Sequence, residues 1–319
     1  MGLFDKPEVT VLKESSDAKE YLNRLEDLIK NIEKESDFYQ RIEKEIAITK
    51  AGIIGEDQIM FELKNSGMNL VVLHDIYIED SSGNSAQIDY LVITPNVSVI
   101  IECKNLFGNI EINNKGDFIR TIEFNNRRYK EGIYSPITQN ERHMRVYKNC
   151  RVSTKGFLIG KLFDKMFEKY NKSLIVLANP KTVVNDRYAP SSIKKQVLRV
   201  DRLVSVLRNM ESDVKYKKKE MLALGEEILS MNIESRKDYF VKFEELQKEY
   251  MQEKMKEQSQ KIEKEKIEVK DEKTDNRNNK FCPRCGNELV KRIAKKGKNQ
   301  GNQFWGCSSY PKCRYTEDL

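Results

Sequence analysis

The chain lacks three features that would otherwise direct its interpretation. It has only two histidines in 319 residues, His74 and His143, so an active site built mainly from histidine is not expected. No apolar run approaches the roughly 20 residues that a transmembrane helix needs. No signal peptide opens the chain, because residues 1–6 are short and mixed in character. We therefore predict a cytoplasmic protein that does not enter a membrane.

The composition is that of a water-exposed chain with many helices. Charged residues make up 34% and hydrophobic residues 39%, and the mean hydropathy is -0.68. The net charge of +7 favours an anionic partner. Six cysteines without a secretion signal favour metal ligands or free thiols over a disulfide framework. A chain of this length is expected to fold as two or three parts.

The most informative stretch is a predicted hairpin over residues 86–104. Two runs rich in β-branched residues flank residues 95–96, and a turn there would pair residues whose numbers sum to 191. Asp89 would then face Glu102, with Lys104 on the same face of the strand as Glu102. Like charges directly opposed across two strands, with Cβ atoms roughly 4.5–5.5 Å apart, repel each other. The pair therefore favours a bound divalent cation.

The N-terminal part is predicted to be helical. Apolar residues at steps of three and four predict a helix over residues 14–50, and a second helix over 53–63 after a break at residues 51–52. Glu56 falls on the face of the second helix that must point inward. It is either a boundary residue that reaches solvent or part of a metal or substrate site, and the periodicity does not decide between them.

Strand and helix patterns alternate over residues 49–230, which predicts one α/β domain. Strands are expected at 70–78, 110–112, 118–122, 173–180 and 197–200, and helices from Pro136, with Ser135 as N-cap, and from 201 to 207. Residues 241–280 carry 11 Lys and Arg against 11 Asp and Glu, which predicts a charged helix followed by a disordered spacer over 271–280. The expected parts are a helical region 1–48, the α/β domain 49–230, a linker 231–280 and a C-terminal ribbon 281–319.

Four cysteines near the C-terminus have the spacing of a zinc site: Cys282, Cys285, Cys307 and Cys313. Two cysteine pairs within forty residues are enough to bind one tetrahedral zinc. Four thiolates leave no open coordination position, so this zinc is expected to be structural and to supply most of the folding free energy of so small a ribbon.

The same ribbon is predicted to bind nucleic acid. Residues 281–319 contain 8 Lys and Arg against 3 Asp and Glu, a net charge of +5. Cations interleaved with aromatic residues suit phosphates and stacked bases, particularly in single strands. The candidate contact residues are Lys291, Arg292, Lys295, Lys296, Lys298, Phe304 and Trp305. The alternative is that Phe304 and Trp305 only pack the ribbon and the lysines form a solvated hairpin.

Four motifs in order resemble those of the nuclease-related (NERD) domain, over about residues 49–165: Gly55-Glu56, Gln87-Ile88-Asp89, Ile101-Glu102-Cys103-Lys104, and Ser135-Pro136-Ile137-Thr138-Gln139. That family is assigned to the restriction-endonuclease-like PD-(D/E)xK superfamily, so the resemblance implies a mixed sheet flanked by helices. The tail resembles the zinc finger at the C-terminus of type IA topoisomerases, through its Cys-Pro-x-Cys-Gly opening and its Phe-Trp-Gly-Cys-Ser-x-Tyr-Pro-x-Cys ending.

The first resemblance implies roles for individual residues. Asp89 and Glu102 would hold Mg²⁺ or Mn²⁺, with the Cys103 carbonyl as a third ligand. Lys104 would orient or help to deprotonate the attacking water, Glu56 would complete or position the metal site, and Gln139 would support it.

The expected function is Mg²⁺-dependent hydrolysis of phosphodiester bonds in DNA, with the zinc ribbon as a tethered DNA grip. Two alternatives stay open. One is a non-catalytic DNA-binding protein with a degenerate nuclease fold, and the other is a regulatory protein that self-associates through its helical segments.

Overall fold

The structure is a computed structural model that describes residues 6–14, 16–124, 127–233, 239–274 and 280–319. The chain separates into two compact units, Met1–Leu246 and Gln247–Leu319.

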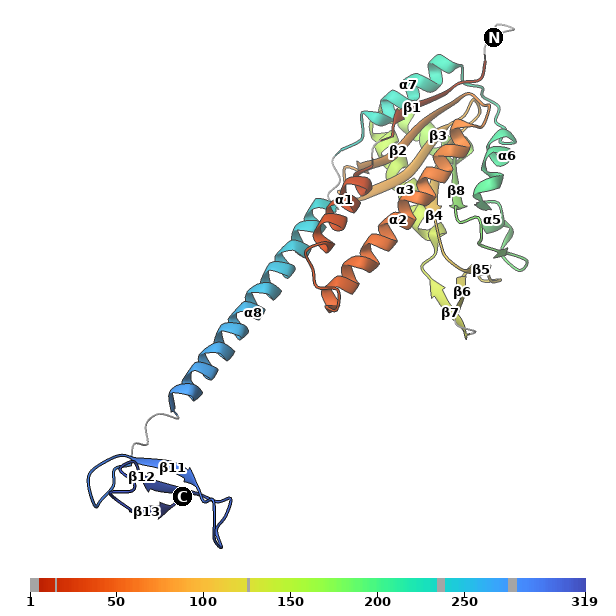
Figure 1. The fold of residues 1–319 in the computed structure, drawn as a ribbon. Helices are drawn as coiled ribbons and strands as arrows, with labels where there is room; N and C mark the ends of the chain where they lie inside the picture. The colour runs from red at the N-terminus through yellow and green to blue at the C-terminus, as the bar shows by residue number, and fades with distance from the viewer. Residues whose placement is uncertain (1–5, 15, 125–126, 234–238, 275–279) are drawn as a thin grey trace. The chain divides into compact units, whose positions relative to one another are not determined.

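The first unit is built on a six-stranded mixed sheet in the order β1-β2-β3-β4-β8-β10 (Figure 1). Its strands are β1 Val9–Lys13, β2 Leu70–Glu79, β3 Ser85–Ile93, β4 Ser98–Lys104, β8 Asn171–Leu177 and β10 Val197–Arg199. The central strands β2, β3 and β4 are antiparallel, whereas β1, β8 and β10 join their neighbours in parallel. The predicted α/β class and the strands at 70–78, 173–180 and 197–200 are confirmed. Strand β1 was not predicted.

Helices cover both faces of this sheet and create two hydrophobic layers. Helices α2 (Asp37–Lys64) and α6 (Leu203–Arg208) pack on one face, and α3 (Pro136–Ser153) and α7 (Lys218–Leu229) pack on the other. Aliphatic side chains from alternating strand positions fill both layers, and burying each one stabilises the fold by roughly 1.5–3 kcal/mol. The predicted helix start is confirmed, because the Ser135 side chain caps α3 at the backbone N–H of Thr138.

The predicted position of the break between the two N-terminal helices, residues 51–52, was wrong. Helix α1 covers Asp17–Ile29 and α2 covers Asp37–Lys64, so the chain breaks at residues 30–36 and runs unbroken through Gly52. The Ser36 hydroxyl, which accepts from the Tyr39 N–H, starts α2. A lone glycine costs a helix interior only about 1 kcal/mol, so Gly52 does not end it. The expected boundary at 48/49 therefore falls inside one continuous helix.

A second sheet, in the order β7-β6-β5-β9, is inserted in the chain between β4 and α3 apart from its short strand β9. Its strands are β5 Asn109–Ile112, β6 Phe118–Phe124, β7 Arg127–Ile133 and β9 Val184–Asn185. The strands predicted at 110–112 and 118–122 are confirmed. Strand β7 escaped prediction because it is an exposed polar edge strand, held in register partly by the ion pair between Arg120 and Glu131, whose Nε and Oε1 atoms lie 2.6 Å apart.

The remaining elements of the first unit support the two sheets or extend from them. They are α4 Phe157–Tyr170, α5 Ser191–Lys194, the 3-10 turn Val200–Arg202, and the first residues of α8, which covers Tyr239–Thr274. The predicted charged helix in the linker is confirmed, and it extends through residues 271–274, where a spacer was expected. The rest of that spacer lies largely outside the described residues. Among the described helices, none is long and apolar enough to cross a membrane.

The end of the second unit is a three-stranded antiparallel ribbon. It consists of β11 Leu289–Ile293, β12 Gln303–Cys307 and β13 Thr316–Asp318, in that order. Its small core contains Leu289 and three of the four cysteines, with Trp305 and Tyr315 packed against them. So few apolar side chains cannot stabilise a fold alone, which leaves the folding free energy to a bound metal.

Candidate functional site

The predicted hairpin register is confirmed over four pairs. Tyr90 pairs with Ile101 and Ile93 with Ser98, so the paired numbers sum to 191. The ladder ends at Tyr90, one residue short of the expected pair. Asp89 instead turns its carboxylate toward the partner strand, where Oδ2 accepts from the Cys103 N–H at 2.7 Å. An extended residue directs its N–H and C=O to the same side, so the Cys103 carbonyl also faces the space beside Asp89.

Glu102 is the most buried carboxylate of the candidate site, with 2% of the residue exposed. Its Oε1 accepts from Lys104 Nζ at 2.6 Å, and the same Nζ donates to Gln139 Oε1 at 3.0 Å. Its Oε2 lies 3.4 Å from His143 Nδ1 without a hydrogen bond, and neither of these buried atoms has a hydrogen-bond partner among the described residues. Sequence reasoning missed His143, although it lies one helical turn after Gln139 and on the same face of α3.

Helix α2 brings Glu56 to the site through a close approach at Gly55. A Cβ atom at Gly55 would lie 2.7 Å from Asn105 Cβ and 3.0 Å from Cys103 Sγ. Only glycine allows the helix to lie this close to β4. Asn105 reinforces the contact by donating to the Ala51 carbonyl at 2.6 Å.

Glu56 is paired with His74, the other histidine of the chain. Its Oε2 lies 3.0 Å from His74 Nε2, and His74 Nδ1 lies 3.1 Å from the Glu14 carbonyl oxygen. A carbonyl only accepts, so Nδ1 carries a proton and directs Nε2 at the carboxylate. Burial opposes a charge on His74, but Glu56 and the Glu14 carbonyl outweigh it and raise the pKa of His74. His74 was interpreted from sequence as a plain strand residue, and its contact with Glu56 was not predictable from local pattern.

The backbone beside the site adopts an uncommon conformation. Between the paired positions His74–Tyr90 and Ile76–Ile88, Asp75 has φ 54°, in the left-handed region. Lys13 holds this segment by donating to the carbonyls of His74 and Asp75. Non-glycine residues in this region cost about 1–3 kcal/mol and cluster at functional sites.

The electrostatics of the carboxylates favour a cation. Burial and then the nearby charges of Glu102 and Glu56 raise the pKa of Asp89 well above its usual value, against the opposing effects of the Cys103 N–H and Lys104. Burial would also raise the pKa of Glu102, but His143 and Lys104 outweigh it and lower that pKa. Asp89 therefore lacks compensating positive charge, whereas Glu102 already has some.

The structure thus brings Glu56, Asp89, Glu102, Lys104 and Gln139 to one end of β4. The carboxylates do not close into a three-acid cage. Within the described ranges, the four cysteines are the one group of three or more His, Cys, Asp or Glu whose ligand atoms all lie within 4.8 Å of one another. Carboxylate and carbonyl oxygens are the ligand types that Mg²⁺ prefers, and Mg²⁺ usually keeps several waters beside one or two carboxylates.

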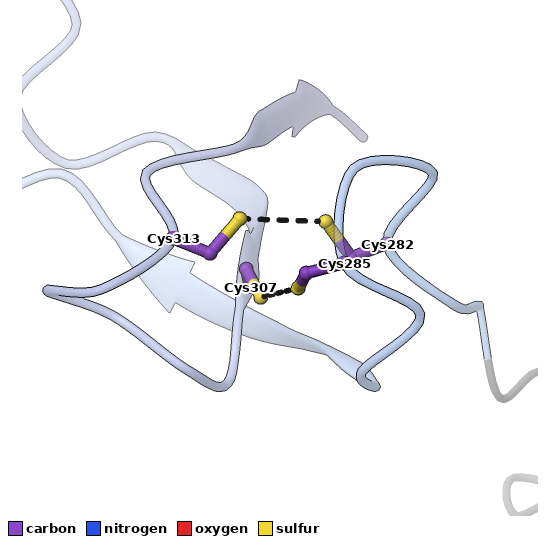
Figure 2. Close-up of side chains that lie close together, drawn as sticks. All are labelled: Cys282, Cys285, Cys307 and Cys313. Atoms are coloured by element: carbon purple, nitrogen blue, oxygen red, sulfur yellow. Dashed lines mark hydrogen bonds between the residues drawn. The ribbon is translucent and has the colours of Figure 1, made fainter.

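The four cysteines of the ribbon converge on one point (Figure 2). The Sγ atoms of Cys282 and Cys313 lie 3.7 Å apart, and those of Cys285 and Cys307 lie 3.3 Å apart. Zn–S bonds of about 2.3 Å in a tetrahedron require S···S distances of roughly 3.8 Å. The cluster therefore has the size and ligand chemistry of a structural zinc site.

The surroundings of Cys285 favour a thiolate ligand. The backbone N–H of Asn287, followed by the neighbouring Cys307, lowers the pKa of Cys285 to about 6. The Asn287 side chain also donates to Cys285 Sγ at 3.6 Å and to Ser309 at 2.7 Å. Outer contacts of this kind orient metal ligands.

The predicted nucleic-acid residues fall on two faces of the ribbon. Lys291 pairs with Trp305 across β11 and β12, and Arg292 pairs with Phe304, so the two pairs point to opposite faces. Lys291 Nζ lies 5.4 Å from the Trp305 ring centroid, and Trp305 packs against the cysteine core. Trp305 therefore packs the ribbon, as the alternative prediction has it, and it also lies against a lysine. Lys295, Lys296 and Lys298 lie in the exposed loop after β11.

The second face of the ribbon is hollowed. A cavity of about 230 Å³ is lined by Arg292, Phe304, Tyr310 and Arg314, among others. The Arg292 guanidinium lies 5.7 Å from the Tyr310 ring centroid. Gly306 makes room for the Arg292 stem, because a Cβ there would lie 3.0 Å from Arg292 Cδ.

Comparison with known protein families finds a match for the α/β domain and another for the C-terminal ribbon. Residues 51–178 match the family described as "Nuclease-related domain", NERD, and residues 279–319 match "Topoisomerase DNA binding C4 zinc finger". The chain carries a NERD domain and a topoisomerase-type zinc ribbon. The motif-based identification of both parts is thereby confirmed. All five candidate residues around β4 fall within the NERD match, and all four cysteines fall within the ribbon match.

The curated relatives resemble short stretches of the chain. One stretch of 53 residues, 17% of this chain, is 60% identical to DNA topoisomerase 1 of Methanocaldococcus jannaschii, and covers 6% of that protein. Another of 43 residues, 14% of this chain, is 51% identical to the uncharacterized protein YrdD of Escherichia coli (strain K12), and covers 21% of it. The chain thus spans only a small part of each relative. No solved structure matches the chain significantly.

Proposed function

We propose that this protein is a Mg²⁺- or Mn²⁺-dependent nuclease that hydrolyses phosphodiester bonds in DNA, with the zinc ribbon as a second DNA-binding part. The observation that carries the proposal is the grouping of Asp89, Glu102 and Lys104 at the end of β4 inside the NERD domain. Residues of these types combine metal ligands with a cation for developing negative charge.

The donor set fits a divalent cation. Glu102 Oε2 is buried and has no hydrogen-bond partner among the described residues. The raised pKa of Asp89 marks carboxylate charge that the surrounding groups do not balance. Asp89, Glu102 and the Cys103 carbonyl would hold Mg²⁺, which prefers oxygen ligands. The chemistry that a bound Mg²⁺ supplies is neutralisation of phosphate charge and a more acidic water.

The other side chains would orient the reactants. Lys104 donates to both Glu102 and Gln139, so its ammonium is held at the end of β4 beside the proposed metal ligand Glu102. There it would stabilise negative charge as that develops and orient the attacking water. Glu56, whose carboxylate contacts His74, would complete or position the metal site.

The ribbon would bring DNA to the nuclease. Its net charge of +5 and its exposed lysines favour phosphate contacts, and Phe304 beside Arg292 offers a surface for a base. Because the ribbon belongs to the same chain, its binding raises the effective concentration of DNA at the nuclease.

Cleavage assays on the full chain test the proposal. Supercoiled, linear and single-stranded DNA and RNA would be incubated with Mg²⁺ or Mn²⁺. We expect the wild type to cleave DNA and Glu102→Gln to lose roughly 100-fold or more, the scale of losing one charge-stabilising group. The matched control is Glu111→Gln on β5, which removes a carboxylate from an exposed ion pair with Lys130 and should keep wild-type activity.

The proposal fails if all substrates survive both metals, or if Glu102→Gln and Asp89→Asn cleave like the wild type. DNA binding without cleavage would favour the non-catalytic alternative.

Self-association through the helical segments remains a separate prediction. Sedimentation at several protein concentrations tests it, and a constant monomer mass would contradict it.

A further inference from the structure

Two buried atoms of the candidate site face each other without a hydrogen bond. Glu102 Oε2 and His143 Nδ1 lie 3.4 Å apart, and neither has a hydrogen-bond partner among the described residues. The other carboxylate oxygen of Glu102 already accepts from Lys104. Buried polar atoms are normally paired, because burial without a partner costs free energy. The arrangement therefore suits a ligand that binds to both atoms at once.

The packing of helix α3 holds the imidazole in this place. Asn140 is 0% exposed, and its side chain donates to a hydroxyl and a carbonyl of β8 at 2.9 Å and 3.2 Å, which fixes α3 against the sheet. His143 follows Gln139 by four residues, so the two side chains are neighbours on one face of the helix. Both side chains reach the end of β4, since Gln139 accepts from the lysine beside Glu102 and His143 lies against Glu102 itself.

A metal ion would satisfy both atoms. An imidazole with its proton on Nε2 presents a lone pair at Nδ1, and a carboxylate oxygen only accepts, so neither atom can donate to the other. Two atoms bound to one ion at about 2.1 Å lie roughly 3.0 Å apart at right angles and roughly 4.2 Å apart when opposite. The 3.4 Å between Glu102 Oε2 and His143 Nδ1 falls within this range.

These two side chains are the preassembled part of the site. No carboxylate oxygen of Asp89 lies within 4.8 Å of both ligand atoms, since the four cysteines form the one such group of three or more in the part of the chain that the structure describes. Asp89 would close on the ion or bind it through a water. Waters or phosphate oxygens would fill the other positions, as in hydrolytic metal sites that keep open positions.

We infer that His143 is a ligand of the metal ion at the candidate site and binds it together with Glu102. The inference rests on the proposed function, whose metal it narrows. Mg²⁺ takes oxygen ligands, whereas the first-row transition ions also accept imidazole, with affinity rising from Mn²⁺ through Co²⁺ to Ni²⁺. Of the two ions proposed above, Mn²⁺ is therefore the one that this site prefers.

Pulsed electron paramagnetic resonance tests for the nitrogen ligand in the full-length, zinc-loaded protein. Mn²⁺ would be added at less than one equivalent, without DNA, and the spin echo examined for coupling to nitrogen. We expect ¹⁴N coupling, replaced by ¹⁵N coupling when histidine alone is supplied in its ¹⁵N form. The chain has only two histidines, so the labelled protein reports on His143 and His74 and on no other side chain.

A pair of matched variants separates the two histidines. His143→Gln should abolish the nitrogen coupling and lower the Mn²⁺ affinity roughly 10-fold or more, with a smaller change for Mg²⁺. In the control, His74→Gln, the coupling should remain, because His74 Nδ1 lies 3.1 Å from the Glu14 carbonyl oxygen and Nε2 lies 3.0 Å from Glu56. Circular dichroism checks that both variants fold, and the labelled wild type needs no variant.

Mn²⁺ bound without nitrogen coupling in the wild type, or no bound Mn²⁺, would overturn the inference. Coupling that survives in His143→Gln would also overturn it. A higher metal affinity in His143→Gln would show instead a protonated His143 that pairs with Glu102 and competes with the ion. Failure of the proposed nuclease activity is distinguishable, since it appears as absent cleavage and leaves the nitrogen coupling intact.

Discussion

Replacing Gly55 by alanine offers a sharp test of how helix α2 is held against the candidate site. A Cβ at position 55 would lie 2.7 Å from Asn105 Cβ, 3.0 Å from Cys103 Sγ and 3.3 Å from Ala178 Cβ. Cys103 lies in β4, Asn105 follows β4, and Ala178 follows the neighbouring strand β8. These atoms belong to paired strands and the residues just after them, so they have little freedom to move. The added methyl group should push α2 away from β4 and carry Glu56 with it.

The magnitude follows from comparison with a second glycine in the same helix. Nothing lies within 4 Å of a Cβ at Gly52. Alanine there should gain only the helix propensity difference, about 0.8–1.0 kcal/mol. Gly55→Ala gains the same amount and loses about 1–3 kcal/mol to overpacking. The two variants should therefore differ by about 1–3 kcal/mol in the free energy of unfolding, with Gly55→Ala the less stable.

Urea unfolding followed by circular dichroism at 222 nm measures this difference, and cleavage assays follow the displacement of Glu56. The expected result is a lower urea midpoint and lower activity for Gly55→Ala, with a raised midpoint and unchanged activity for Gly52→Ala. If Gly55→Ala is as stable and as active as Gly52→Ala, the close approach of α2 to β4 does not exist as described.

Three further predictions concern metal, pH and salt. Removing zinc with a chelator should unfold the ribbon and shift the emission of Trp305, the single tryptophan of the chain, to longer wavelength, because metal binding supplies about 10–16 kcal/mol to such domains; an unshifted spectrum would contradict a structural zinc. The pair of His74 with Glu56 raises the pKa of His74 above its usual 6.5, so its stabilisation is complete below that pH and is lost as the pH rises through the raised value. Glu56→Gln should therefore destabilise the fold more at about pH 6 than at about pH 9, and an equal loss at both would refute the charged pair. Deleting residues 281–319 should weaken DNA binding and flatten its dependence on salt, since fewer phosphate contacts remain; unchanged affinity and slope would exclude the ribbon as a DNA grip.

Local pattern was sufficient to predict the hairpin of β3 and β4. The β-branched runs and the turn at 95–96 set a register that the structure reproduces over residues 90–93 and 98–101. The end of that ladder could not be read from the sequence. It depends on the left-handed Asp75 in the neighbouring strand and on the Asp89 carboxylate taking the Cys103 N–H, both of which require the assembled sheet.

Contacts between distant segments account for most of what was missed. Neither histidine belongs to a recognisable sequence motif. Each nevertheless lies beside a carboxylate of the candidate site, His74 beside Glu56 and His143 beside Glu102. Strand β7 has no apolar periodicity to detect, since it is a polar edge strand. The break predicted at residues 51–52 is wrong because a single glycine does not end a helix, whereas the cap at Ser36, which the prediction did not include, determines where α2 starts.

The edge strands of the main sheet determine how far the chain can be truncated and still fold. The segment matched by the NERD family, 51–178, begins in the middle of α2 and ends just after β8. A fragment with those ends would lose β1 and β10, and so would expose the hydrogen-bonding edges of β2 and β8 to pairing with other chains. It would also lose Glu14, whose carbonyl orients His74. The region of family resemblance is thus smaller than the piece of chain that can fold, and an expression fragment should extend through the whole unit ending at Leu246.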